Sequence, residues 1–150
     1  MWPAALPRFF SGIKLVHNTG VAIREGLVLL DPEAADLDEV LSQVVTYCCS
    51  EEIVPIDLQV ELLKTLQDRE SLASTAIGGG VAIPHAYLEG IRRPIIAFVR
   101  FKKPLTVDSP DDQAVRYAFV LIGPTGQVDV HLATLSGIAR AMSDSEVQHD

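Results

Sequence analysis

The 150-residue sequence predicts an α/β domain in which helices cover a β-sheet. Three observations predict this fold class. Apolar residues recur at helical spacing in three segments, about four short apolar runs are typical of strands, and turn-forming residues separate the segments. One domain is expected at this length, and a hydrophobic fraction of 48% is enough to build a core, which excludes a disordered chain.

The chain is expected to form its first strand at residues 26–31, whose sequence is GLVLLD. A helix is expected from Leu37, because Asp36 and Glu39 form the capping-box pattern that is typical of helix starts. Apolar residues then follow at helical spacing as far as Cys48, which predicts one buried face.

A second helix is expected from Pro55, which suits a first helical turn, and it should fray near residues 69–71. The small residues at 74–80 predict a loop. Residues 81–83 then predict a short strand that is stopped by Pro84.

The second half of the chain is expected to contain two longer strands and a helix. Residues 94–101 predict the first of these strands, and residues 104–110 predict a loop. Residues 114–122 are almost wholly apolar, which indicates a central strand buried on both faces. Gly and Pro residues at 123–126 break that strand, and helical spacing predicts a third helix from about Asp129.

Charge and cysteine content narrow the function classes. Twenty acidic residues outnumber twelve basic ones, so the net charge is −8, which argues against nucleic acid or an anionic membrane as the main partner. A basic patch on a protein partner fits better. No apolar run reaches the roughly 18–20 residues of a membrane helix, so no membrane insertion is expected. Cys48 and Cys49 are adjacent, which predicts free thiols in a reducing cytoplasm rather than a disulfide framework.

The first 24 residues differ from the rest, because they carry Arg8, Lys14 and Arg24 and no acidic residue. We expect residues 1–24 to form an N-terminal arm or packed lead-in, with a basic amphipathic leader as the alternative. The domain itself is expected at residues 25–150.

His85 is the histidine whose surroundings indicate chemistry. Gly78–Gly80 lets the backbone approach a ligand or take positive φ, and Ser74 and Thr75 place hydroxyl groups beside that loop. The amides of such a loop can donate to an anion, although the Gly-Lys-Ser/Thr of a P-loop is lacking, which disfavours nucleotide binding. From the residues alone, a functional His85 and a structural turn histidine remain equally open.

His131 and Arg69 each have two interpretations. His131, near the start of the third expected helix, is either a locally packed histidine or a second imidazole that donates to a charged group on His85. Arg69 is either a solvated charge or a guanidinium that faces phosphate. His17 and His149 have no metal-ligand spacing to a cysteine, histidine or carboxylate cluster, so no metal site is expected.

Residues 69–86, RESLASTAIGGGVAIPHA, resemble the signature of the fructose–mannitol class of enzyme IIA in the bacterial phosphoenolpyruvate-dependent sugar phosphotransferase system. The nitrogen-regulatory members of that family share the signature. The resemblance extends in layout over residues 26–144, through the long apolar strand, its Gly-Pro break and His131. It implies a mixed β-sheet flanked by helices, with the family's last helix absent, trimmed or supplied from elsewhere.

The resemblance also implies a phosphotransferase that needs no cofactor. In that family the histidine of the Pro-His pair, here His85, accepts a phosphoryl group from the histidine-containing phosphocarrier protein. Arg69 and His131 match the family's other catalytic side chains. The positions implied in phosphate binding are Ser74, Thr75, Gly79 and Gly80.

Three functions follow from this resemblance, all of them cytoplasmic. The first is a phosphocarrier that passes the phosphoryl group to an enzyme IIB domain during sugar uptake. The second is a regulatory module that controls a transporter or kinase through its phosphorylation state. The third is a scaffold that has lost phosphorylation, against which the intact set of Arg69, His85 and His131 argues.

Overall fold

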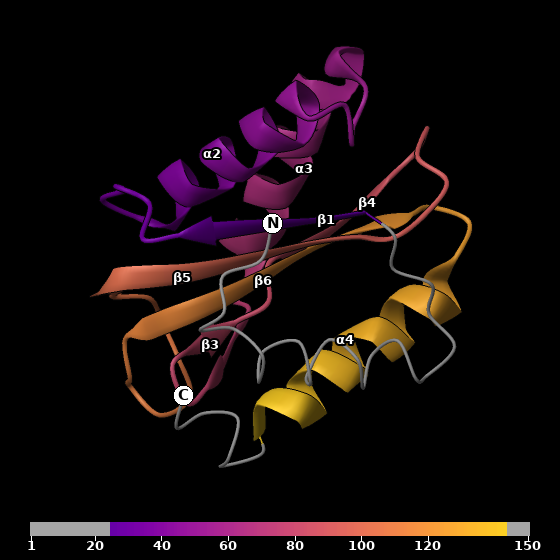
Figure 1. Cartoon of the computed structure of the whole chain (residues 1–150). Coiled ribbons are helices and arrows are strands. Elements are labelled where there is room, and N and C mark those ends of the chain that lie inside the picture. The colour runs from indigo at the N-terminus through magenta and orange to yellow at the C-terminus, as the bar shows by residue number, and fades with distance from the viewer. Residues whose placement is uncertain (1–24, 144–150) are drawn as a thin grey trace.

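The computed structural model describes residues 25–143, in which helices lie on both faces of one sheet (Figure 1). Helices α2 and α3 cover one face, and α4 covers the other. The elements in chain order are β1 (Glu25–Leu30), α2 (Leu37–Ser50), the 3-10 turn η1 (Ile56–Leu58), α3 (Gln59–Leu72), β2 (Ala76–Gly78), β3 (Val81–Ala82), β4 (His85–Leu88), β5 (Ile95–Leu105), β6 (Val115–Pro124) and α4 (Val128–Ser143).

The sheet is mixed, which confirms the predicted fold class. Its six strands follow the order β1-β5-β6-β3-β2, and β4 also pairs with β6. β1 runs parallel to β5, and both β3 and β4 run parallel to β6, whereas β5 and β6 are antiparallel. β6 is therefore the central strand, and it sets the position of the short strands that precede and follow Pro84.

Residues on the two faces of β6 enter two separate apolar cores. Ala118, Val120 and Ile122 pack in the core beneath α2 and α3. Phe119 and Leu121 pack in the core beneath α4. This burial on both faces confirms the prediction for residues 114–122.

The start of α2 also agrees with the sequence. The Asp36 carboxylate accepts a hydrogen bond from the Glu39 amide at 2.9 Å, as a capping residue does. At the other end, the Glu52 amide donates to the Cys49 carbonyl and the Ile53 amide donates to the Cys48 carbonyl. Glu52 has a φ of +59°, the left-handed conformation that usually selects glycine after a helix.

Two strands of the sheet were not predicted. Residues 74–80 were expected to be a loop, but Ala76–Gly78 forms β2 and pairs with β3. Pro84 was expected to end the strand, but pairing resumes at His85 in the register of β3, with Ala82 opposite Ala118 and His85 opposite Leu121. The strand continues because the Pro84 carbonyl still accepts a hydrogen bond from the Leu121 amide at 2.8 Å.

Other boundaries shift by a few residues. β5 continues to Leu105, into the expected loop at 104–110, and β6 continues to Pro124. The second helix begins at Gln59, because the residues after Pro55 form the η1 turn.

Several expectations concern residues outside the described range. The N-terminal arm at 1–24, His17, His149 and any helix after Ser143 belong to this group. Within residues 25–143, none of the helices has the length and apolarity that crossing a membrane requires. Cys48 and Cys49 are both buried free thiols.

Candidate functional site

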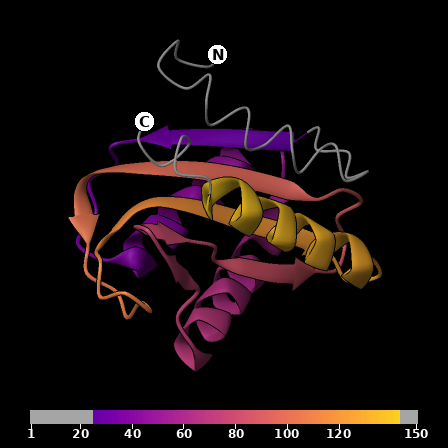
Figure 2. The same cartoon turned by 90° about the horizontal axis from the view of Figure 1, so that it is seen from below.

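A hollow of about 370 Å³ lies between the start of β4 and α4. Figure 2 shows β4 passing next to α4, where Tyr87 packs on His131. Its lining includes Arg69 from the last turn of α3, Ser74 and Thr75 from the connection to β2, and His85 from the start of β4. Leu135 and two other residues of α4 close the opposite side. The fold thus brings four of the predicted site residues to one place.

The half-buried His85 ring has a defined orientation. Its Nδ1 lies 2.8 Å from the carbonyl oxygen of Ile83, two residues earlier in the chain. A carbonyl oxygen can only accept a hydrogen bond, so Nδ1 carries the hydrogen and Nε2 of the neutral ring holds the lone pair. The local turn through Pro84 therefore leaves Nε2 as the ring nitrogen with a free lone pair.

His131 lies next to His85 and is buried, with 2% of its surface exposed. The two ring centroids are 5.5 Å apart, and the Tyr87 ring packs on His131 at 4.2 Å. The Nδ1 edge of His131 faces Gly123, where an added Cβ would come within 2.2 Å of that nitrogen. Glycine at 123 therefore makes the space that the ring occupies.

Both nitrogens of His131 lack a hydrogen-bond partner within the part of the chain that the structure describes. Burial, together with repulsion from a charged His85, lowers the pKa of His131 from 6.5 to about 4. The ring is therefore neutral at pH 7 and keeps one unpaired N–H donor. A buried polar group without a partner is uncommon in native proteins, so His131 stands out among the polar residues of this site.

Arg69 and Ser74 retain donors that could reach an anion in the hollow. One Nη1–H of Arg69 donates to the Ala73 carbonyl at 2.8 Å, which orients the guanidinium, and its other N–H groups have no partner among residues 25–143. The Ser74 hydroxyl oxygen accepts from the Ala76 amide at 3.2 Å, and its hydrogen has no partner in the same range. The hollow thus combines a cation with a hydroxyl donor. His131 is not part of its lining but lies beside His85, which is.

Glu70 is a neighbour of the site that the sequence did not single out. Its carboxylate accepts hydrogen bonds from both the amide and the hydroxyl of Thr75, at 2.8 and 2.7 Å. Its place beside Arg69 in the signature was the available signal. Tyr87 was also missed, because nothing in the local sequence connects it with His131.

The structure does not bring Gly79 and Gly80 to this hollow, since neither residue is part of its lining. The Gly79 amide donates instead to the Asp111 carboxylate at 2.8 Å. That bond, together with one from the Gln113 amide, holds the pKa of Asp111 below its usual value. An anion near Gly79 would meet this carboxylate.

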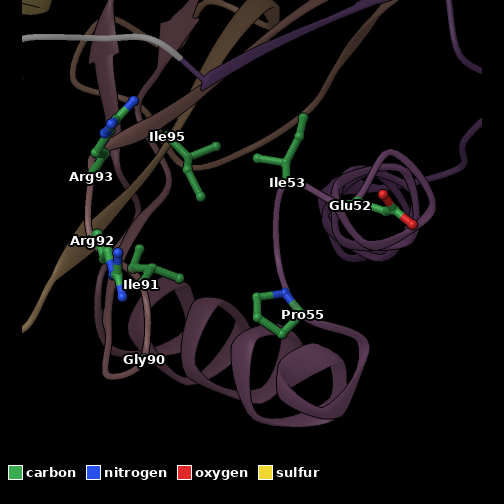
Figure 3. A pocket seen from close by; sticks show the side chains of 8 residues that line it. All are labelled: Glu52, Ile53, Pro55, Gly90, Ile91, Arg92, Arg93 and Ile95. Atoms are coloured by element: carbon green, nitrogen blue, oxygen red, sulfur yellow. The ribbon is translucent and has the colours of Figure 1, made fainter.

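A second hollow of about 380 Å³ lies between the end of α2 and the β4–β5 connection (Figure 3). Arg92 and Arg93 stand on one side and Glu52 on the other, around the apolar Ile53 and Ile95. It contains cations but no histidine, cysteine or hydroxyl nucleophile. Of these two hollows, the one at His85 therefore has the chemistry of group transfer. Across residues 25–143, no three His, Cys, Asp or Glu side chains are grouped so that they could hold a metal ion.

Comparison with known proteins decides the family. Residues 22–150 match the sequence model of a family described as "Phosphoenolpyruvate-dependent sugar phosphotransferase system, EIIA 2". The chain belongs to the EIIA 2 family.

Relatives of this EIIA 2 chain carry two kinds of name. A nitrogen regulatory protein of Bradyrhizobium diazoefficiens is 37% identical over 57% of this chain and 56% of its own length. A fructose-specific EIIA component of Haloferax volcanii is 30% identical over 62% of this chain and 60% of its own length. The matched part thus spans little more than half the length of these relatives.

A solved structure supports the same fold. Nitrogen regulatory protein IIA-Ntr of Neisseria meningitidis superposes on this EIIA 2 chain with a TM-score of 0.71 at 29% identity. The superposition covers 79% of this chain and 80% of that one.

Proposed function

We propose that this EIIA 2 chain accepts a phosphoryl group on Nε2 of His85 from the histidine-containing phosphocarrier protein and passes it to an enzyme IIB domain. The observation that carries the proposal is the 2.8 Å contact between His85 Nδ1 and the Ile83 carbonyl. It leaves the lone pair on Nε2 of a residue that shares a hollow with Arg69.

The transfer exchanges one P–N bond for another. The lone pair on Nε2 attacks phosphorus, the bond from phosphorus to the donor's imidazole breaks, and that bonding pair returns to the donor ring. Nδ1 of His85 keeps its hydrogen throughout and continues to donate it to the Ile83 carbonyl. An imidazole is both a competent nucleophile and a good leaving group, so the same atoms support onward transfer.

Stabilisation of the phosphoryl oxygens falls to the donors around the hollow. Phosphoryl transfer depends mostly on positioning and on electrostatic stabilisation of these oxygens. The free N–H groups of Arg69 and the Ser74 hydroxyl supply donors in the hollow, and the unpaired N–H of His131 supplies one from the ring beside His85. Because the Nδ1 edge of His131 lies against Gly123, we assign the donor toward a phosphoryl group on the neighbouring His85 to Nε2.

We expect electrostatic attraction to guide docking of the donor protein. The net charge of −8 suits a basic patch on the donor, chiefly through the association rate and orientation. Transfer between such carrier proteins takes place in the cytoplasm, which is where we place this chain.

A second candidate shares the same phosphorylated histidine. The names of the Bradyrhizobium and Neisseria relatives, both nitrogen regulatory proteins, favour a regulatory module. We propose a transporter or kinase as the target of such a module. Phosphorylation adds roughly −2 of charge beside the hollow, which is enough to change what binds there. Transfer from the phosphorylated protein to an enzyme IIB domain favours the carrier, whereas retention of the phosphate favours the regulator.

Intact-mass measurement tests the shared step. The protein is incubated with phosphoenolpyruvate, enzyme I and the phosphocarrier protein, alongside His85→Ala. We expect one acid-labile phosphoryl group on the wild type and none on the variant. A folded wild type that gains nothing from active donors, or a His85→Ala protein that still labels on histidine, contradicts the proposal.

Two further variants test the supporting donors. Arg69→Lys should slow transfer, because a compact ammonium replaces a planar fork of N–H groups, and the exposed Arg140→Lys in α4 is the matched control. His131→Ala should slow transfer without abolishing acceptance. Unchanged rapid-mixing transfer rates in either variant would assign that side chain to packing alone.

A further inference from the structure

The carboxylate of Glu70 clamps a single neighbour with both oxygens. Oε2 accepts the Thr75 amide hydrogen at 2.8 Å, and Oε1 accepts the Thr75 hydroxyl hydrogen at 2.7 Å. Hydrogen bonds to an ionised acceptor are stronger than neutral ones, and two of them fix orientation as well as distance. Thr75 is 7% exposed, so few other positions are open to it.

The clamped residue begins a continuous chain of hydrogen bonds that ends at the nucleophile. The Ile83 amide donates to the Thr75 carbonyl at 3.1 Å. The Ile83 carbonyl in turn accepts the Nδ1–H of His85 at 2.8 Å. Glu70 is thus connected to the His85 ring through Thr75 and Ile83, although it is not part of the hollow's lining.

We infer that Glu70 is a positioning residue for His85, which acts through Thr75 and Ile83 to hold Nδ1 on the carbonyl and Nε2 free. The expected effect of Glu70 on phosphoryl transfer rests on the proposed function, whereas its effect on the orientation of the His85 ring does not. Loss of the clamp frees Thr75, the Ile83 peptide loses one of its anchors, and the imidazole is no longer restricted to one tautomer. Arg69 steadies the same connection from the preceding position, through its bond to the Ala73 carbonyl.

The tautomer of His85 tests this inference without any phosphorylation. A long-range ¹H–¹⁵N spectrum at alkaline pH, where imidazoles are neutral, distinguishes the Nδ1–H from the Nε2–H form. We expect Nδ1–H alone in the wild type and a mixture of both forms in Glu70→Gln. The two Thr75 donors bond to different oxygens of Glu70, and in glutamine one of those positions becomes an NH2 group that cannot accept a hydrogen bond. The exposed Glu61→Gln in the same helix is the control and should keep the wild-type spectrum.

Transfer rates provide the second readout. Glu70→Ala should slow phosphoryl transfer by roughly 10- to 100-fold, the range that follows from misplacing a reacting group. Since Glu70 acts through Thr75, combining Glu70→Ala with Thr75→Val should slow transfer by less than the product of the two single losses.

The outcomes separate the inference from the proposed function. Wild-type tautomers and wild-type rates in Glu70→Gln would overturn the positioning role, as would losses that multiply in the double variant. A wild type that takes no phosphate defeats the proposed function. The tautomer comparison of Glu70→Gln with Glu61→Gln still decides the inference in that case, and Glu70→Gln keeps the size of the side chain so that the fold is retained.

Discussion

Buried, uncharged His131 should make the folded protein sensitive to mild acid. Its pKa is about 4 in the folded state, against 6.5 for an ordinary histidine. Between these two pH values His131 is protonated in the unfolded chain and neutral in the folded chain. The stability that this residue contributes is therefore complete above about pH 6.5 and is lost as the pH falls toward 4.

The expected loss follows from the two pKa values. They differ by about 2.5, and each pKa unit corresponds to about 1.4 kcal/mol. At pH 4 the folded histidine is half protonated, so the free energy of unfolding should fall by about 3 kcal/mol between pH 7 and pH 4 on account of this group. A small domain has only about 5–15 kcal/mol of stability in total, so the loss is easily measured.

Urea unfolding of the wild type and of His131→Leu, at several pH values between 7 and 4, measures the pH-dependent contribution of His131 to the free energy of unfolding. Leucine fills similar space and does not titrate. Carboxylates and the other histidines act on both proteins, so the difference in unfolding free energy isolates His131 together with its coupling to His85. Between pH 7 and pH 4 we expect the wild type to lose about 3 kcal/mol more unfolding free energy than the leucine variant. Parallel pH dependence in the two proteins would refute the buried, neutral state of His131.

Three other predictions follow from single observations. Gly123→Ala should destabilise the protein by about 1–3 kcal/mol and slow phosphoryl transfer, because the new Cβ would lie 2.2 Å from His131 Nδ1. Gly126→Ala is the control and should have neither effect, since its Cβ would have no atom within 4 Å, and equal urea midpoints for the two variants would contradict the prediction. Glu52→Gly should raise the free energy of unfolding by about 0.5–1 kcal/mol, since glycine adopts a φ of +59° without strain, and a lowered urea midpoint would count against it. Cys48 and Cys49 should react with a thiol reagent only at the rate of unfolding, because both are buried and burial raises the pKa of Cys48 to about 12; fast labelling of the native protein would contradict this.

Elements encoded by local signals were predictable from the sequence. The Asp36 cap located the start of α2, and the unbroken apolar run located β6 at the centre of the sheet. β4 was missed because Pro84 is a local strand breaker, yet its carbonyl bond to Leu121 carries the pairing past it. That bond depends on a strand more than thirty residues away, which no local pattern records.

The candidate site shows the same division between local and distant information. The motif around residues 69–86 contains the residues that share one hollow, Arg69, Ser74, Thr75 and His85. The amides of the glycine turn looked available for an anion, but Asp111 on a distant loop takes the Gly79 amide. The packing of Tyr87 on His131 joins β4 to α4 and could be seen only once the sheet was built.

The central claim is that Nε2 of His85 carries the phosphoryl group. The measurement that tests it most directly is a long-range ¹H–¹⁵N spectrum of the ¹⁵N-labelled protein after incubation with phosphoenolpyruvate, enzyme I and the phosphocarrier protein. We expect the His85 signals to show phosphorylation at Nε2, with Nδ1 still protonated and bound to the Ile83 carbonyl. Phosphate on Nδ1, or an unmodified His85 in the presence of active donors, would contradict the account.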